Sequence, residues 1–493
     1  MSLIPRWLVG ALLLIAAAPA LATWRVAETA HFRVYDRQSE KRLRERATLL
    51  EDYVALLKLL TNRRDLPEGA PRLDVFLIDD VADAMPFERP DQNIAGFYVA
   101  TPGRIAAFAE TGATGQVILL HEYTHHFMLG SNTAAYPKWY VEGFAEYFAT
   151  AKFNADTIEF GGVPPGRGSQ LVRGDWLPLT RLLARDPALR GPAETAAFYA
   201  ESWLLAHYLQ RVPGQSARLR AYLAAVAGGA DSLSAFREHV DPDIEAFERR
   251  LRRYMTSRDM TLSRFPRPSV AAADVRVTAL PPSADALLLR LTALELTRPR
   301  DNRRALAEIT KATARYPGDA FARRVLAFAT LRLGDRGAAA PLIDALLAEA
   351  PDDAKLLRWR ALASDGADRA AMRRLLVRSY RADPSDWRTM LAYVRLADPR
   401  IGRLDDNDLA VALRAHELAP QVGEVVLVTA TALAQADRLA EASRILAPLA
   451  YSSHNVAMTA IAGALLQRAQ AGDKAGFLAL VQRPSRGAPP PAE

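Results

Sequence analysis

The sequence predicts two parts of different fold class, an α+β domain followed by an all-α helical-repeat region. The first part shows the order strand, helix, strand, hairpin, helix, which is typical of an α+β domain. The second part is rich in alanine, leucine and arginine, and its helices recur at a regular interval. A chain of 493 residues is also too long for one ordinary domain, which agrees with this division.

The composition indicates a globular protein with a mixed surface charge. Half of the residues are hydrophobic, and 63 basic residues against 56 acidic ones leave a formal net charge of +7. No dense block of lysine and arginine interleaved with aromatic residues is present, so we expect no nucleic-acid binding. The chain contains no cysteine, which excludes disulfides, a lipid anchor on cysteine and a zinc site built from cysteines.

Residues 1–22 are expected to be a signal peptide. Arg6 supplies a positive charge, an apolar run extends from Trp7 to Ala18, and Ala20-Leu21-Ala22 is a small-x-small cleavage site. The apolar run is short for a membrane span, although an uncleaved N-terminal anchor is the alternative. We therefore expect an exported bacterial protein, periplasmic or secreted, with no membrane span after removal of the signal.

The first part is expected to cover residues 23–260, and its elements follow from hydrophobic periodicity and turn signals. Strands are predicted at 31–35 and 73–78, and a hairpin at 96–109 turns at Thr101-Pro102-Gly103-Arg104. The expected helices cover 39–60, 115–129, 138–151 and 194–211, with further helices to about residue 257. Residues 161–192 are rich in glycine and proline and are expected to form loops.

The second part follows a proline-rich linker expected at residues 261–285. Over residues 286–482 four prolines stand between predicted helices at intervals of 34, 33 and 36 residues, namely Pro317, Pro351, Pro384 and Pro420. The segment that ends at Pro351 resembles a tetratricopeptide repeat, a helix pair that stacks into a solenoid. A plain helical bundle is the alternative, and residues 483–493 are expected to be a disordered tail.

The stretch that carries chemistry is His121-Glu122-Tyr123-Thr124-His125, a HExxH motif. On a helix its two histidines lie one turn apart on the same face, so both imidazoles can reach one Zn²⁺ ion. Glu122 then points toward the open coordination position, where it can act as a general base. The adjacent His126 lies about 100° further round the helix and is expected to have a core or surface role.

The next predicted helix carries the sequence KWYVEGFAEYF over residues 138–148, which resembles the third-ligand helix of the gluzincin zinc metallopeptidases. The resemblance implies a zincin-like peptidase domain with one Zn²⁺ held by His121, His125 and Glu142. It also implies that Glu146, one turn after Glu142, hydrogen-bonds a zinc histidine outside the ligand set. A rival assignment makes Glu146 the third ligand.

The same resemblance implies an oxyanion donor on a downstream helix. The segment FYAESWLLAHY, residues 198–208, resembles that helix and makes Tyr199 the candidate, with His207 as the runner-up. A peptide substrate is expected to pair with an edge strand beside the motif helix. That strand is one arm of the hairpin, either 97–100 or 105–108.

The sequence as a whole therefore predicts a zinc-dependent peptidase that acts on a peptide or protein, with Glu122 as general base and a possible protein partner on the repeats. Two alternatives stay open at this point. One is a catalytically inactive peptidase-like scaffold that binds a partner through its repeats. The other is a zinc amide hydrolase that acts on cell-wall material.

Overall fold

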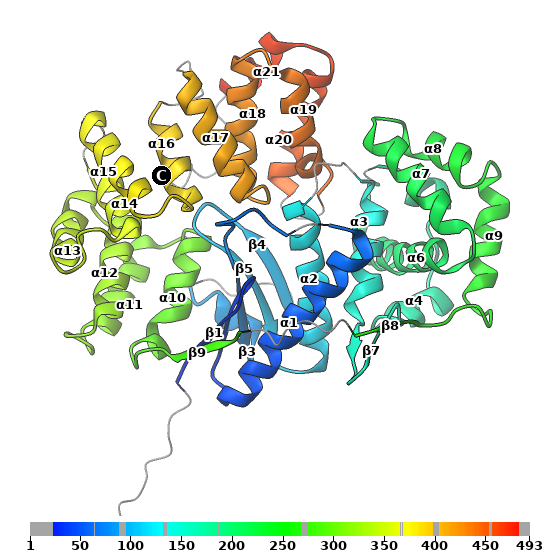
Figure 1. Cartoon of the computed structure of the whole chain (residues 1–493), viewed down its shortest axis with the longest axis horizontal. Coiled ribbons are helices and arrows are strands. Elements are labelled where there is room, and N and C mark those ends of the chain that lie inside the picture. The colour runs from blue at the N-terminus through cyan, green and yellow to red at the C-terminus, as the bar shows by residue number, and fades with distance from the viewer. Residues whose placement is uncertain are drawn as a thin grey trace, which may run out of the picture.

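The structure is a computed structural model, and it describes residues 23–63, 65–87, 95–131, 136–185, 187–267, 274–364, 366, 368–397, 404–452 and 456–482. The expected signal peptide at 1–22 and the expected tail at 483–493 lie outside these residues. The described residues form a mixed α/β structure in the first part of the chain and a helical second part (Figure 1).

A six-stranded sheet organises the first part, in the strand order β4-β5-β3-β2-β1-β9. The three central strands run parallel, whereas β4 and the pair β1 and β9 run antiparallel to their neighbours. The strands are β1 (Arg25–Glu28), β2 (Phe32–Asp36), β3 (Leu73–Ile78), β4 (Gly96–Ala100), β5 (Ile105–Glu110) and β9 (Arg276–Ala279). The strand at 73–78 and the hairpin with its turn at 101–104 are thus confirmed.

Both faces of this sheet are covered, which explains why β3 is apolar on both faces apart from Asp74, whose carboxylate is paired with arginines. Val75 and Leu77 belong to a core shared with α1 (Glu40–Thr61) and α2 (Ala113–Ser131). Phe76 and Ile78 point to the opposite face and pack in a second core with α10 (Ala284–Leu296). Alternate side chains of a strand point to opposite faces, so a strand buried on both sides has no polar period.

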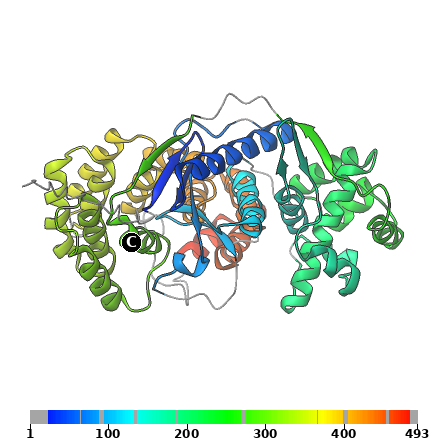
Figure 2. The same ribbon diagram turned by 90° about the horizontal axis from the view of Figure 1, so that it is seen from below.

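The remaining elements of the first part lie beside the sheet and form a helical layer with a small three-stranded sheet of order β6-β7-β8 (Figure 2). They are α3 (Lys138–Ala149), β6 (Lys152–Phe153), β7 (Thr157–Phe160), α4 (Arg167–Arg173), α5 (Leu179–Leu182), α6 (Gly191–Arg211), α7 (Gln215–Ala227), α8 (Ser232–His239), α9 (Ile244–Tyr254) and β8 (Ser263–Pro266). The short η1 (Val81–Ala84) is the exception, because it packs in the second core with α10.

The second part is a succession of helices that curves around one side and the top of the sheet in the view of Figure 1. After α10 these are α11 (Asn302–Thr313), α12 (Ala320–Leu333), α13 (Arg336–Glu349), α14 (Ala354–Leu362), α15 (Arg369–Ala382), α16 (Trp387–Leu396), α17 (Asp406–Leu418), α18 (Gly423–Gln435), α19 (Leu439–Ala450), α20 (Val456–Gln470) and α21 (Lys474–Gln482). We call α10–α21 the helical arc. Each of the four prolines stands between two of its helices, as predicted.

Two segments expected to be irregular contain regular structure. The expected linker, 261–285, supplies β8 to the small sheet and β9 to the large one, and its residues 268–273 lie outside those described. The expected loops at 161–192 contain the short helices α4 and α5. In both segments, pairing or packing with distant residues determines the local structure, which prolines and glycines in the sequence do not reveal.

No helix within the described ranges is both long and apolar enough to cross a membrane.

Candidate metal centre

The motif helix α2 is held against the sheet by one face and presents its histidines on another. Leu120, Tyr123 and Phe127 are buried in the core that α2 shares with the sheet and α1. The hydroxyl of Thr124 lies 2.7 Å from that of Tyr53 on α1 and donates to the carbonyl of Leu120. These contacts fix the rotation of the helix about its axis.

The second helix of the site, α3, begins after Pro137 and brings two buried carboxylates to the same place. Glu142 and Glu146 are one turn apart on α3 and are 1% and 3% exposed. Gly143 faces α6, where an added Cβ would stand 2.3 Å from the carbonyl oxygen of Ser202. Only glycine allows this approach between α3 and α6, and the approach places Tyr199 of α6 near the carboxylates.

Three potential ligand atoms converge between α2 and α3. The Nε2 atoms of His121 and His125 are 3.0 Å apart, and the Oε2 atom of Glu142 lies 3.4 Å from the first and 3.3 Å from the second. This group is able to hold a metal ion. The structure therefore brings together the three residues that the sequence predicted as ligands.

The charges of these groups depend strongly on one another. Burial opposes protonation of His121, but its hydrogen bond with Glu142 and the charges of nearby glutamates outweigh burial and raise its pKa to about 9. Burial alone would raise the pKa of Glu142, yet the positive charge of His125 and the hydrogen bond with His121 hold it well below its usual value. Glu142 is thus an anion, and positive charge is favoured between it and the histidines.

Glu122 occupies a different environment although it is adjacent to His121. Its Oε2 atom is buried and has no hydrogen-bond partner among the described residues. Burial raises the pKa of Glu122, and the charges of Glu142 and Glu146 act in the same direction. A carboxylate with an unsatisfied buried oxygen and a raised pKa is suited to accept a proton from a bound molecule.

Glu146 lies beside the ligands without joining them. Its Oε1 atom is 3.9 Å from Nδ1 of His121, which is an ion-pair distance but too long for a hydrogen bond. The same oxygen accepts two hydrogen bonds from Arg167, at 3.0 Å from Nε and 2.5 Å from a terminal nitrogen. Glu146 thus lies near His121 but does not make the predicted hydrogen bond with it, because its oxygen is bonded to Arg167 on α4 instead.

Arg167 also fixes the candidate oxyanion donor. Its guanidinium carbon lies 4.9 Å from the ring centroid of Tyr199, and that ring is 6.4 Å from the ring of His121. The negative charge of Glu142, together with burial, raises the pKa of the Tyr199 hydroxyl. The hydroxyl therefore stays protonated and can donate a hydrogen bond.

The other two histidines considered in the sequence belong to the core. His207 is 1% exposed, its Nδ1 lies 2.9 Å from the hydroxyl of Tyr254, and burial lowers its pKa to about 4. His126 is also buried, its Nδ1 lies 3.1 Å from the hydroxyl of Tyr98, and burial likewise lowers its pKa to about 4. Both are neutral packing residues with hydrogen-bond partners outside the metal group.

The hairpin beside α2 offers one open strand edge among the described residues. β5 is hydrogen-bonded on both sides, by β3 and by β4, so the arm 105–108 has no free edge. β4 stands at the end of the strand order, and its Tyr98 contacts His126 of the motif helix. Of the two predicted arms, 97–100 is the one at the edge.

Arg167 is the site residue that sequence reasoning missed. It stands in the Gly/Pro-rich segment that was expected to be loop, twenty-one positions after its partner Glu146. The segment carries no hydrophobic periodicity, so nothing in the sequence distinguishes Arg167 from an arginine that is exposed to solvent.

Comparison with profiles of known protein families found no match, and no curated protein or solved structure matched the chain either.

Proposed function

We propose that this protein is a zinc-dependent peptidase of the gluzincin type, with His121, His125 and Glu142 as ligands and Glu122 as general base. The observation that carries the proposal is the convergence of three ligand atoms from two helices beside a buried glutamate with an unsatisfied oxygen. Structural zinc sites usually have four protein ligands, often cysteines, whereas three ligands leave a position for water and substrate.

The geometry of the donor atoms supports zinc as the metal. For a tetrahedral ion with bonds of about 2.0–2.1 Å to nitrogen and oxygen, neighbouring ligand atoms are about 3.3 Å apart. The three separations in this group are 3.0, 3.3 and 3.4 Å. Neither oxygen of Glu142 has a hydrogen-bond donor other than the two imidazoles among the described residues, so a cation is the missing partner.

The residues around the ligands then have separate roles in hydrolysis. When bound, the ion polarises the scissile carbonyl and lowers the pKa of water. Glu122 accepts the proton of the attacking water and delivers it to the leaving amine. Tyr199 donates its hydroxyl hydrogen to the carbonyl oxygen as negative charge develops there. Arg167 positions both Tyr199 and Glu146.

An extended polypeptide is the substrate that fits this arrangement. β4 stands at the end of the strand order beside α2, and a peptide that adds a strand there would lie alongside the motif helix. Export through the segment 1–22, a tetratricopeptide-like architecture of the helical arc and a protein partner on it are further parts of the proposal.

Glu122→Gln tests the mechanism, because glutamine keeps the size of the side chain and cannot accept the proton. We expect wild type and variant to bind one zinc ion per chain, measured by plasma mass spectrometry. Cleavage of a quenched-fluorescence peptide library should fall by at least about 100-fold in the variant, the usual contribution of a general base. Glu40→Gln, an exposed position on α1, is the matched control and should leave both measurements unchanged.

Full cleavage activity in a zinc-loaded Glu122→Gln variant would contradict the mechanism. A wild type that binds zinc but cleaves no library peptide would favour the inactive scaffold. If such a wild type instead released amine groups from soluble peptidoglycan fragments, the cell-wall amide hydrolase would replace the peptidase.

A further inference from the structure

A large cavity separates the sheet from the inner face of the helical arc. Its volume is about 1020 Å³, and its walls come from the β4–β5 turn, Thr101–Arg104, and from helices α10, α12, α14, α16, α18, α20 and α21. Gly103 in this turn packs so closely on α10 that an added Cβ would stand 1.9 Å from the carbonyl oxygen of Glu295. The cavity therefore begins where β4 ends.

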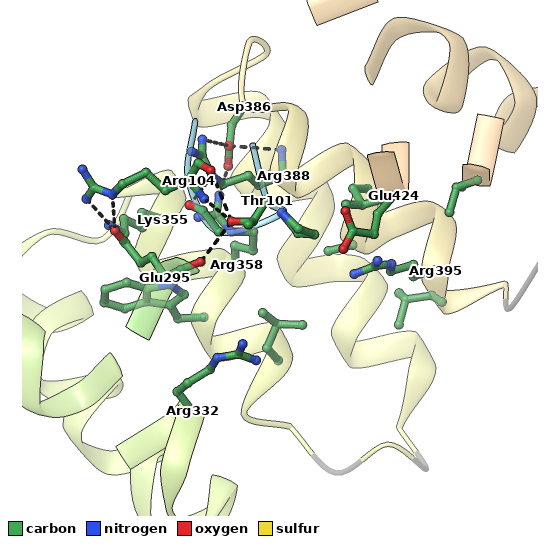
Figure 3. Close-up of a pocket in the computed structure, with 18 of the residues that line it drawn as sticks. Thr101, Arg104, Glu295, Arg332, Lys355, Arg358, Asp386, Arg388, Arg395 and Glu424 are labelled. Atoms are coloured by element: carbon green, nitrogen blue, oxygen red, sulfur yellow. Dashed lines mark hydrogen bonds and ion pairs between the residues drawn. The ribbon is translucent and has the colours of Figure 1, made fainter. Parts of the chain in front are cut away.

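The end of the cavity next to this turn holds a cluster of charged side chains (Figure 3). Five of its side chains are cationic and three are carboxylates. We call it the junction cluster, and it consists of Arg33, Arg104, Lys355, Arg358 and Arg388 with Asp74, Glu295 and Asp386.

Every carboxylate of the junction cluster is shared between two cations. Asp74 accepts from Arg33 at 2.6 Å and from Arg104 at 2.5 Å. Glu295 accepts from Arg104 at 2.6 Å and from Lys355 at 2.9 Å.

Asp386 is shared in the same way, since it pairs with Arg358 and lies 3.9 Å from Arg388. Asp383, which also lines the cavity, accepts from the backbone and the hydroxyl of Ser385. Counted with Asp383, whose negative charge also acts on Arg358, the junction cluster has one more positive than negative charge.

The side chains of Arg104 and Arg358 are buried, whereas those of Arg33 and Lys355 are 41% and 40% exposed. Burial, followed by repulsion from Arg388, lowers the pKa of Arg358 to about 9, and burial lowers that of Arg388 to about 10.

A further arginine of the cavity, Arg332, donates from Nε to the backbone carbonyl of Leu294 at 3.4 Å and makes no ion pair with a carboxylate among the described residues. Buried charges in proteins are normally compensated, so a bound anion would complete this charge balance.

The rest of the cavity combines apolar side chains with further charged ones, among them Arg395 and Glu424 (Figure 3). Trp359 and Phe328 stack with ring centroids 4.9 Å apart, and Leu391 and Leu465 line the wall further along. Thr431 stands among these apolar residues. A wall of this kind suits a chain with alternating apolar side chains and polar backbone groups better than a plain hydrocarbon chain.

We propose that the cavity binds an extended polypeptide, with a carboxylate at Arg358, Arg388 and Lys355 and with apolar side chains against Trp359 and its neighbours. The carboxylate is either the C-terminal group of the polypeptide or an Asp or Glu side chain. The choice of a polypeptide as the ligand rests on the proposed peptidase function. The inference that the cationic end of the cavity binds an anion does not depend on that function.

The position of the turn connects this cavity to the candidate metal centre. Tyr98 of β4 contacts the motif helix, and Gly103 accepts a hydrogen bond of 3.0 Å from Nε of Arg388. β4 ends at Ala100, and its turn lines the cavity. A substrate on the edge of β4 would therefore run from the motif helix toward the cavity.

The test measures binding of a decapeptide library to full-length Glu122→Gln protein, which is expected to bind substrate without cleaving it. The library is made in two forms, one with a free C-terminal carboxylate and one with a C-terminal amide, and retained peptides are identified by mass spectrometry. We expect at least tenfold stronger retention of free-acid peptides over amides, or enrichment of Asp and Glu near the end of the retained amides. The first result identifies the chain terminus as the source of the carboxylate, and the second identifies a side chain.

Two variants locate the binding site. Arg388→Gln removes one charge but can still donate to Gly103, and Arg332→Gln removes a charge without leaving a carboxylate unpaired. Each should weaken retention of the acidic peptides by about tenfold or more, with zinc content unchanged. Arg304→Gln, an exposed position on α11 that pairs with Glu308, is the control and should bind as the parent does. Arg332→Gln keeps the test decisive if Arg388→Gln does not fold.

Equal retention of free-acid and amide peptides with no acidic enrichment would overturn the inference, as would unchanged binding by both variants. If dodecanoate bound more tightly than every peptide, the ligand of the cavity would be a hydrocarbon anion and not a polypeptide. The failure of the peptidase proposal is a separate result, because it appears as absent cleavage by wild type while charge-dependent binding persists.

Discussion

Three buried glutamates on neighbouring helices differ in charge because their surroundings differ. Glu142 lies between two imidazoles and keeps its charge, whereas at Glu122 burial outweighs the opposing charges of His121 and His125 and raises the pKa. Glu201 on α6 is 2% exposed and accepts a hydrogen bond of 2.7 Å from the backbone of Leu177, and burial raises its pKa to about 8. The low pKa of Glu142 suits a metal ligand, and the raised pKa of Glu122 suits a general base. The raised pKa of Glu201 has a consequence for stability.

Glu201→Gln should remove a pH dependence of folding stability. Folded protein holds a proton on Glu201 up to about pH 8, whereas unfolded protein releases it near the ordinary value of 4.5. Between these pH values the unfolded state therefore binds fewer protons than the folded state, so the free energy of unfolding falls as pH rises. We expect the variant to match wild type near pH 4 and to be more stable by a few kcal/mol at pH 9, measured by urea denaturation. An equal pH dependence in both proteins would show that Glu201 titrates normally.

The residue-scale prediction from sequence succeeded where local spacing fixes geometry. Two histidines four positions apart must share a helix face, and Glu142 on the next helix was identified through its resemblance to a known third-ligand segment. The structure brings all three together. Arg167 could not be found in this way, because its contact with Glu146 depends on how α4 folds back over α3.

At the scale of elements, the site depends on how closely α3 and α6 pack. Gly143 directly follows the ligand Glu142, and its Cα faces the backbone of Ser202. A methyl group there would meet a carbonyl oxygen that cannot rotate away. The separation of the two helices is thus coupled to the position of a ligand.

Gly143→Ala should push α3 and α6 apart and disturb the metal group. We expect a loss of about 1–3 kcal/mol in the free energy of unfolding, typical of overpacking, and weaker zinc binding in competition with a chelator. Gly463→Ala in α20 is the matched control, because an added Cβ there meets nothing within 4 Å. It should instead raise stability by about 0.5–1 kcal/mol, since alanine is the better helix former. If Gly143→Ala kept wild-type zinc affinity, the packing of α3 against α6 would not control the geometry of the ligands.

The elements that periodicity predicted are those that carry a continuous hydrophobic signal. The strand at 73–78 and the motif helix are of this kind, and both are found where expected. The strands β8 and β9 are short, and each gains its stability from partners more than a hundred residues away. No local pattern in residues 261–285 contains that information, so a linker was the natural prediction there.

On the scale of the whole molecule, the helical arc and the first part share one hydrophobic core. Trp387 and Met390 of α16 and Leu418 of α17 belong to the same buried cluster as the residues of the sheet, α1 and α2. The turn at Gly103 and the junction cluster add polar contacts across the same boundary. Repeat regions commonly unfold in separate steps, because each repeat contacts only its neighbours. Here the shared core opposes that behaviour.

Trp387→Ala should therefore destabilise the metal centre although it lies in the helical arc. Trp387 is 1% exposed, and removal of such a side chain costs about 3–5 kcal/mol. We expect thermal unfolding by circular dichroism and zinc release to a colorimetric chelator to shift together to lower temperature.

Phe477→Ala in α21 is the control for this variant, because Phe477 is equally buried but belongs to a core formed by the last helices alone. It should loosen the end of the arc, which has no partner beyond it in the described chain, and leave the temperature of zinc release unchanged. If Trp387→Ala also left zinc release unchanged, the two parts would fold independently, and the contacts between them would position the junction cluster without stabilising the first part.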